Sequence, residues 1–122
     1  MSEFPSFTPY VLAGYGSVSD QQFDGTPEQQ ALQFIAYDDL KSAHDLVEEK
    51  SGDLAAYIHG VIHRREGDFF NANYWFQRAE PLPGLLGIRP DELTKLAQEN
   101  AQDNLGAFRD EWNKLVELAK SY

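Results

Sequence analysis

Cysteine is absent from the 122 residues of this chain. Without cysteine the chain can form no disulfide bond and no metal site built from thiolates. This composition is typical of a protein that lives in a reducing compartment, and a cytoplasmic location is the prediction.

Basic residues are scarce. The chain has ten lysines and arginines against twenty aspartates and glutamates, which gives a net charge of −10. Such a chain is repelled by phosphate backbones and anionic lipids, so we expect neither nucleic acid nor membranes among its partners. No apolar run approaches the roughly 20 residues of a membrane span. The N-terminus MSEFPSFTPY lacks the basic start and apolar core of a secretory signal.

Familiar catalytic motifs are missing as well. The sequence contains no nucleophile elbow, no phosphate-binding loop and no dinucleotide fingerprint. Gly60 follows His59, so the HExxH signature of metalloproteases is absent. The sequence therefore leaves open whether the protein is an enzyme.

The apolar pattern predicts an all-α fold with one domain over residues 1–122. Residues 1–25 are rich in proline and glycine but also carry several aromatic residues, which predicts an ordered irregular arm with a short strand at 10–13. Residues 26–122 form the predicted helical core, a small bundle of four to five helices with short connections.

Helix boundaries can be located from capping residues. Thr26, Pro27 and Gln29 form a capping box that starts a helix expected to run to Lys50. Further helices are expected at 53–66, 69–80 and from 90, and a break near 103–106 precedes a last amphipathic segment. The leucines of the loop at 81–90 are expected to tuck beneath it.

Residues 57–80, YIHGVIHRREGDFFNANYWFQRAE, read as a helix, a glycine turn and a second helix. Their glycines, alanines and aromatic residues have the spacing of one tetratricopeptide repeat, in which small residues let the two helices approach. Gly60 and Ala72 are expected to face each other across this hairpin. The pattern does not recur one period earlier or later, so we expect one tetratricopeptide-like hairpin and not a repeat array.

The string HRREGDFFNANYWFQRAE also resembles a segment of a family of small uncharacterised bacterial proteins. Members carry a similar His-Arg-x-Glu-Gly-Asp segment, then an Asn-Ala pair and a Tyr-Trp pair. The segment WNKLVE at 112–117 is loosely similar to the ending of those proteins. The resemblance spans about half of the chain and implies no particular activity.

The three histidines form a candidate metal site. His59 and His63 lie four residues apart on one helix face, a common ligand spacing for zinc or another divalent metal. Counting outward from the turn at Ser51 and Gly52 brings His44 level with His59. All three side chains can then converge, with Asp45 or Glu48 as a further ligand or an orienting partner. Surface or hydrogen-bonding roles for these histidines are the alternative.

A small-ligand site is a second candidate at the same hairpin. Arginines bind carboxylates or phosphates, and aromatic residues with a polar group can line a pocket. Helix-end ion pairing, which would also include Arg65, and packing of the aromatic residues into the core are the alternatives. The adjacent Asp38 and Asp39 are expected on a solvated face. The candidate ligand-binding residues are Arg64, Glu66, Asp68, Asn71, Tyr74, Trp75 and Arg78.

Three functions remain open. The surplus of aromatic residues and the repeat-like hairpin favour a protein-interaction or self-association module, most simply a homodimer. A metal-binding protein or metalloenzyme using His44, His59 and His63 is the first alternative. A protein that binds a small ligand in a charged and aromatic pocket is the second.

Overall fold

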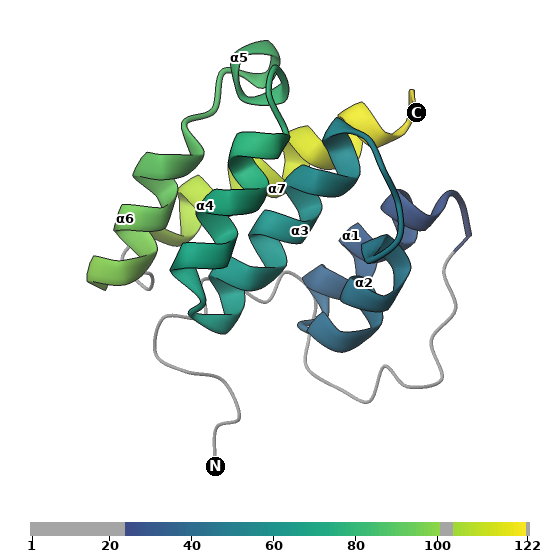
Figure 1. The fold of residues 1–122 in the computed structure, drawn as a ribbon, viewed down its shortest axis with the longest axis horizontal. Helices are drawn as coiled ribbons and strands as arrows, with labels where there is room; N and C mark the ends of the chain where they lie inside the picture. The colour runs from purple at the N-terminus through teal and green to yellow at the C-terminus, as the bar shows by residue number, and fades with distance from the viewer. Residues whose placement is uncertain (1–23, 101–103, 122) are drawn as a thin grey trace.

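The computed structural model describes residues 24–100 and 104–121, and within these ranges the chain forms seven α-helices and no strand (Figure 1). The all-α class is therefore confirmed. The strand predicted at 10–13, and all of the predicted arm except its last two residues, lie outside the described residues. The helices are α1 (Pro27–Ala36), α2 (Leu40–Val47), α3 (Asp53–Glu66), α4 (Phe69–Arg78), α5 (Leu82–Leu86), α6 (Pro90–Asn100) and α7 (Leu105–Ala119).

The expected helix from Thr26 to Lys50 is divided in two. Thr26 and Gln29 form the predicted capping box. However, α1 ends at Ala36, and Asp38 adopts a left-handed backbone with φ 66° before α2 begins. The Asp39 side chain then accepts a hydrogen bond from the Ser42 amide at 3.1 Å and caps α2. Aspartate tolerates the left-handed region better than most residues and also caps helices well, so two adjacent aspartates suit this turn.

The hairpin of α3 and α4 follows the prediction at its turn. Gly67 ends α3 with φ 86°, and the Asp68 side chain caps α4 by accepting from the Asn71 amide at 3.2 Å. The residue of α4 that lies closest to Gly60 is not the expected Ala72. A Cβ atom at position 60 would lie 2.5 Å from Cε1 of Phe76, so Gly60 makes room for this ring and Ala72 is not its nearest neighbour.

Helix α3 is the centre of the molecule. Eleven of its fourteen residues are buried, as expected for a helix that is covered on all sides. Helix α4 lies along one side of α3, the α1–α2 pair lies on the other side, and α7 passes behind them (Figure 1). Of the leucines in the loop at 81–90, Leu82 is buried as predicted, but Leu85 is 73% exposed on the short α5.

Two buried ion pairs fasten α3 to its neighbours. Arg65 pairs with Asp38 in the α1–α2 turn, and Arg64 pairs with Glu111 of α7. Glu111 also accepts a hydrogen bond from the Tyr57 hydroxyl at 2.6 Å. Helix-end ion pairing, one of the alternatives considered for the hairpin, is therefore wrong for both arginines, whose side chains are fully buried in long-range pairs. Asp38 is likewise in the core and not on the solvated face.

None of the helices in the described part of the chain combines the length and the apolar character that crossing a membrane requires.

Candidate metal site

The three histidines come together where α2 packs against α3. His44 lies on α2, and His59 and His63 lie one turn apart on α3. One ring nitrogen of each histidine lies within 4.8 Å of a ring nitrogen of the other two. The Nε2 atoms of His44 and His59 are 3.0 Å apart. The sequence prediction that His44 comes level with His59 thus agrees with the structure, although α2 is shorter than expected.

These distances suit one metal ion after small side-chain movements. Two nitrogens bound tetrahedrally at about 2.0–2.1 Å from zinc lie about 3.3–3.4 Å from each other. The Nε2 atoms of His44 and His59 are already closer than that. A separation of 4.8 Å between two nitrogens falls to this range when ring rotation moves one nitrogen by about 1.5 Å. Such a movement costs little free energy beside a metal–nitrogen bond. Three imidazoles can therefore hold one ion and leave a fourth position for another ligand.

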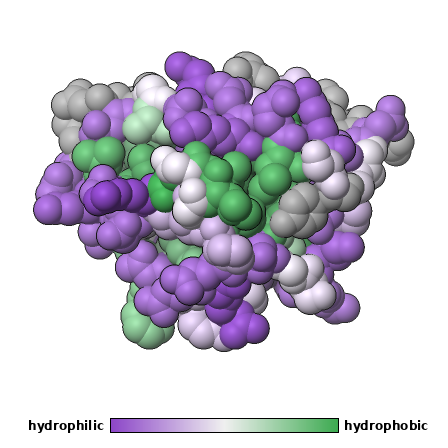
Figure 2. All heavy atoms as spheres, turned by 90° about the horizontal axis from the view of Figure 1, so that it is seen from above, coloured by the Kyte–Doolittle hydropathy of each residue, from purple (hydrophilic) through white to green (hydrophobic). Residues whose placement is uncertain are grey.

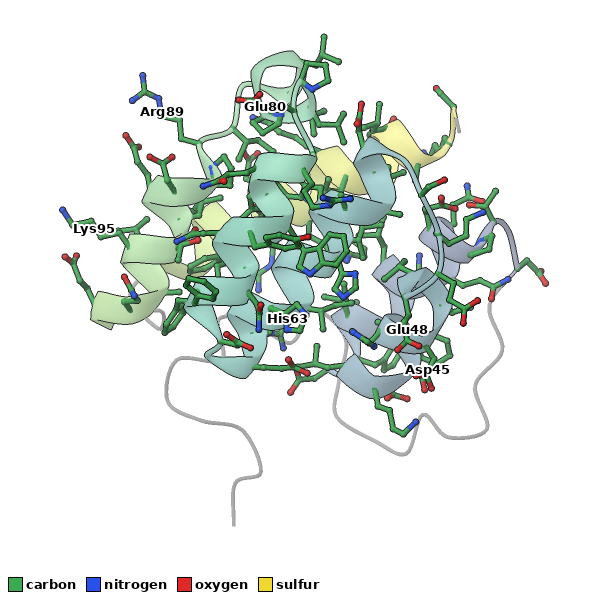
Figure 3. All side chains as sticks on the ribbon, viewed as in Figure 1. Asp45, Glu48, His63, Glu80, Arg89 and Lys95 are labelled. Carbon is green, nitrogen blue, oxygen red and sulfur yellow. The ribbon has the colours of Figure 1, made fainter. Side chains whose placement is uncertain are left out.

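Carboxylates lie beside Nδ1 of two of these rings. Nδ1 of His44 lies 3.2 Å from Glu48 Oε1, one turn along α2. Nδ1 of His63 lies 3.1 Å from Glu66 Oε1 and 3.9 Å from Asp68 Oδ2. When the neutral rings donate Nδ1–H to these carboxylates, their Nε2 atoms carry the lone pairs that a metal needs. Figure 3 shows His63 low on α3, with Glu48 on the neighbouring α2.

His59 sits in a different environment. It is 5% exposed, and its ring stacks on the indole of Trp75 from α4 with centroids 4.0 Å apart and planes 7° apart. It also stacks on His63, with centroids 5.0 Å apart. Burial, together with the nearby His44 and His63, lowers the pKa of His59 to about 4. At neutral pH the ring is therefore uncharged, the form that binds metals.

Asp45 does not join the three histidines. It forms an exposed ion pair with Lys41 at 3.1 Å, and its side chain is directed away from the cluster (Figure 3). His44, Asp45 and Glu48 do have ligand atoms near one another on the surface of α2, but such exposed acidic groups are common without a metal. Of the two carboxylates named from sequence, Glu48 is the one in contact with a histidine.

The candidate ligand-binding residues do not gather around one pocket. Arg64 is buried against Glu111, while Glu66 contacts His63. Asp68 and Asn71 are joined in the α4 cap, where the amide of Asn71 holds the pKa of Asp68 below its usual range. The remaining three form a surface cluster, in which the Arg78 guanidinium lies 5.4 Å from the Tyr74 ring centroid and 5.5 Å from that of Trp75.

A hollow of about 690 Å³ lies elsewhere, between α4, α5 and α6. Phe76, Ile88 and Arg89 are among its lining residues, and none of the candidate ligand-binding residues lines it. Glu80 and Arg89 mark its place near the top of the molecule, far from His63 (Figure 3). The histidine cluster and this hollow are separate features.

Sequence reasoning missed two contributions to the site. The stacking of Trp75 on His59 depends on how closely α4 approaches α3, and the small residue Gly60 beside His59 was the available signal. The pairing of Arg65 with Asp38 ties the turn that precedes α2 to α3, and no local pattern connects residues 27 positions apart. The Arg65–Asp38 pair helps to bring His44 to the other histidines, and the Trp75 stack holds the ring of His59.

Searches for similar proteins found no matching family model, no matching curated protein and no matching solved structure for this chain.

Proposed function

We propose that this protein binds one divalent transition-metal ion, zinc or an ion of similar preference, through His44, His59 and His63. The observation that carries the proposal is the convergence of all three histidines of the chain from two helices, within 4.8 Å of one another. Imidazole is a favoured ligand of zinc and its neighbours, whereas magnesium and calcium prefer oxygen.

The surroundings of the cluster support this proposal. Two of the histidines have a carboxylate on Nδ1, the arrangement that orients metal ligands in many sites. The third is buried, which disfavours its protonation and keeps it available as a ligand. A surface role would need none of these features, because an exposed histidine is satisfied by water.

The test is metal content and metal affinity of protein prepared without a histidine tag. We expect close to one equivalent of zinc after equilibration with Zn²⁺ and dialysis. The variants His63→Gln and His44→Gln are expected to lose the metal while retaining their helical circular dichroism. Metal well below one equivalent in the unsubstituted protein, or equal content in all three proteins, would overturn the proposal.

Self-association is the second candidate function, supported by an exposed apolar face. Figure 2 shows hydrophobic side chains gathered in the middle of the face seen from above, framed by hydrophilic ones. Leu85 of α5 is 73% exposed, and Leu86 and Leu118 line an open hollow of about 420 Å³ beside it. Exposed apolar patches of this kind are typical of contact surfaces, and we take a second copy of this chain as the partner.

Sedimentation of Leu85→Asp beside the unsubstituted protein tests this candidate. We expect a concentration-dependent dimer that the substitution converts to a monomer. Phe70→Asp is the matched control, because Phe70 is 83% exposed and lies at the N-terminal end of α4, whereas α5 follows the C-terminal end of that helix. A monomer at all concentrations, or equal dissociation by both substitutions, would contradict self-association through this face.

A further inference from the structure

We infer that Glu48 and Glu66 are positioning residues of the metal site, which hold His44 and His63 so that both bind the ion through Nε2. This inference rests on the metal site proposed above and adds the residues that orient its ligands. It follows from two contacts, at the C-terminal ends of α2 and α3, and each involves Nδ1 of a histidine ring and leaves Nε2 of that ring for the metal.

The first contact lies at the C-terminal end of α2. Glu48 follows His44 by four residues, so both side chains project from the same face of the helix. Its carboxylate oxygen lies 3.2 Å from Nδ1, while Nε2 of the same ring lies 3.0 Å from Nε2 of His59. The two nitrogens of His44 are therefore divided between a carboxylate on one side and the histidine cluster on the other.

The second contact repeats this arrangement at the end of α3. Glu66 follows His63 by three residues, and its carboxylate oxygen lies 3.1 Å from Nδ1. Asp68, just beyond the Gly67 turn, adds negative charge 3.9 Å from the same nitrogen. The nitrogen left for a metal is again Nε2.

The two carboxylates also act electrostatically. A carboxylate that accepts Nδ1–H makes the imidazole a better donor at Nε2 and fixes the orientation of the ring. Two such carboxylates balance the charge of one divalent ion at a site where all three ligands are neutral. Both glutamates are about half exposed, 54% for Glu48 and 43% for Glu66, so their roles can be tested without disturbing the core.

His59 needs no carboxylate for this purpose. The stack with Trp75 and its burial restrict the ring, so packing replaces the hydrogen bond that orients the other two ligands. The three ligands are therefore held in place in two ways, by carboxylates at the exposed edge and by an aromatic ring in the interior.

The experiment measures Zn²⁺ affinity of full-length protein carrying Glu48→Gln, Glu66→Gln or Glu49→Gln. Glutamine retains the shape but not the charge. We expect each of the first two substitutions to weaken binding about 10–100-fold, the range seen when an orienting partner is removed. Glu49→Gln is the matched control, because Glu49 is the exposed residue next to Glu48 and its substitution removes the same charge. It is expected to change affinity by less than about threefold, since exposed charges are screened.

A second measurement separates positioning from general electrostatics. Two-bond ¹H–¹⁵N correlation spectra distinguish a ring bound to zinc through Nε2 from one bound through Nδ1. We expect Nε2 binding with a protonated Nδ1 for His44 and His63, and a mixture of binding modes or weaker signals in the two variants.

The outcomes distinguish this inference from the metal site itself. If the unsubstituted protein takes up no Zn²⁺, the metal site fails and the positioning roles fail with it. If it binds Zn²⁺ and His63→Gln does not, while Glu48→Gln and Glu66→Gln bind as tightly as Glu49→Gln, the positioning roles alone are overturned. Binding through Nδ1 of either ring would also overturn them.

Discussion

Asp38 is an acidic residue whose ionisation is strongly affected by the fold. Burial raises the pKa of its carboxyl group from 3.8 to about 6, although the Arg65 guanidinium acts in the opposite direction. The neighbouring Asp39 adds to the increase. Because the folded state holds this proton more tightly than the unfolded chain, the corresponding stability is complete below about pH 4 and is lost as pH rises through about 6.

We predict that the free energy of unfolding of the unsubstituted protein falls, relative to that of Asp38→Asn, as pH rises from about 4 to 7. The decrease is at most about 3 kcal/mol, because each pH unit between the unfolded and the folded pKa of Asp38 contributes about 1.4 kcal/mol. Asparagine suits this position because it also tolerates a positive φ. Urea unfolding at several pH values measures the difference, and a constant or rising difference would contradict the prediction.

The comparison with Asp38→Asn is needed because the contribution of His59 to stability changes with pH in the opposite direction. Its pKa is lowered from 6.5 to about 4, so its contribution to stability is present above about pH 6.5 and is lost as pH falls. The effects of Asp38 and His59 on stability therefore partly cancel over much of the same pH range. Metal-free protein must be used throughout, since bound metal would hold His59 in its neutral form.

The histidine cluster shows which site residues can be predicted from sequence. His59 and His63 share a helix face by simple periodicity, and a helical hairpin brings His44 level with them. Glu48 follows from the same periodicity, whereas Glu66 is predicted from sequence only as a ligand-binding residue and not as a partner of His63. By contrast, Arg64 and Arg65 look like surface residues near a turn, and only the packed structure pairs them with Glu111 and Asp38.

At the scale of helices, the α3–α4 contact depends on a glycine. Gly60→Ala would place Cβ 2.5 Å from the Phe76 ring, which is itself held in the core. We predict a loss of about 1–3 kcal/mol in the free energy of unfolding, the usual cost of overpacking. Chemical denaturation followed by circular dichroism measures this loss.

Gly106→Ala is the matched control, and its expected effect has the opposite sign. Gly106 lies within α7, and a Cβ there would meet nothing within 4 Å. Alanine favours the helix by up to about 1 kcal/mol over glycine, so this variant should be equal to the unsubstituted protein or more stable. Equal losses in both variants would contradict the packing explanation.

The sequence predicts where helices begin and end at capping residues better than it predicts breaks inside a long apolar pattern. The caps at Thr26 and Asp68 and the stop at Gly67 follow from local chemistry, and the structure contains all three. The part of the chain that the structure describes holds seven helices instead of the predicted four or five, because α1 and α2 are separate and α5 forms within the loop at 81–90. The turn at Asp38 is joined to α3 by a tertiary ion pair, which periodicity cannot reveal.

At the scale of the whole molecule, α7 is joined to the centre by a buried charge pair. The Arg64 guanidinium lies over the rings of Phe76 and Phe108, 5.2 and 5.3 Å from their centroids, and pairs with Glu111. Removing one partner leaves a buried charge without its counterion. We predict that Glu111→Leu costs about 3–5 kcal/mol of stability.

Replacing both partners should restore much of this loss. Arg64→Met combined with Glu111→Leu exchanges two buried charges for apolar groups of similar size, which is often neutral or stabilising. Thermal unfolding of the single and double variants makes the comparison. A double variant no more stable than Glu111→Leu would contradict the prediction, because the loss would then not come from leaving the Arg64 charge without Glu111.

Metal binding should stabilise the whole fold because its ligands come from two helices. A ligand present at 100 times its dissociation constant adds about 2.7 kcal/mol to the free energy of unfolding. For a chain of this size we predict a rise in Tm of about 8–15 °C with Zn²⁺. Calorimetry with and without the metal measures this rise, and His63→Gln should show little of it.

The most direct test of the metal site is titration of the metal-free, tag-free protein with Zn²⁺ in a calorimeter. The account predicts one saturable site per chain, which disappears in His63→Gln and persists in Glu49→Gln. A titration without saturable heat, or one site of unchanged affinity in His63→Gln, would contradict it.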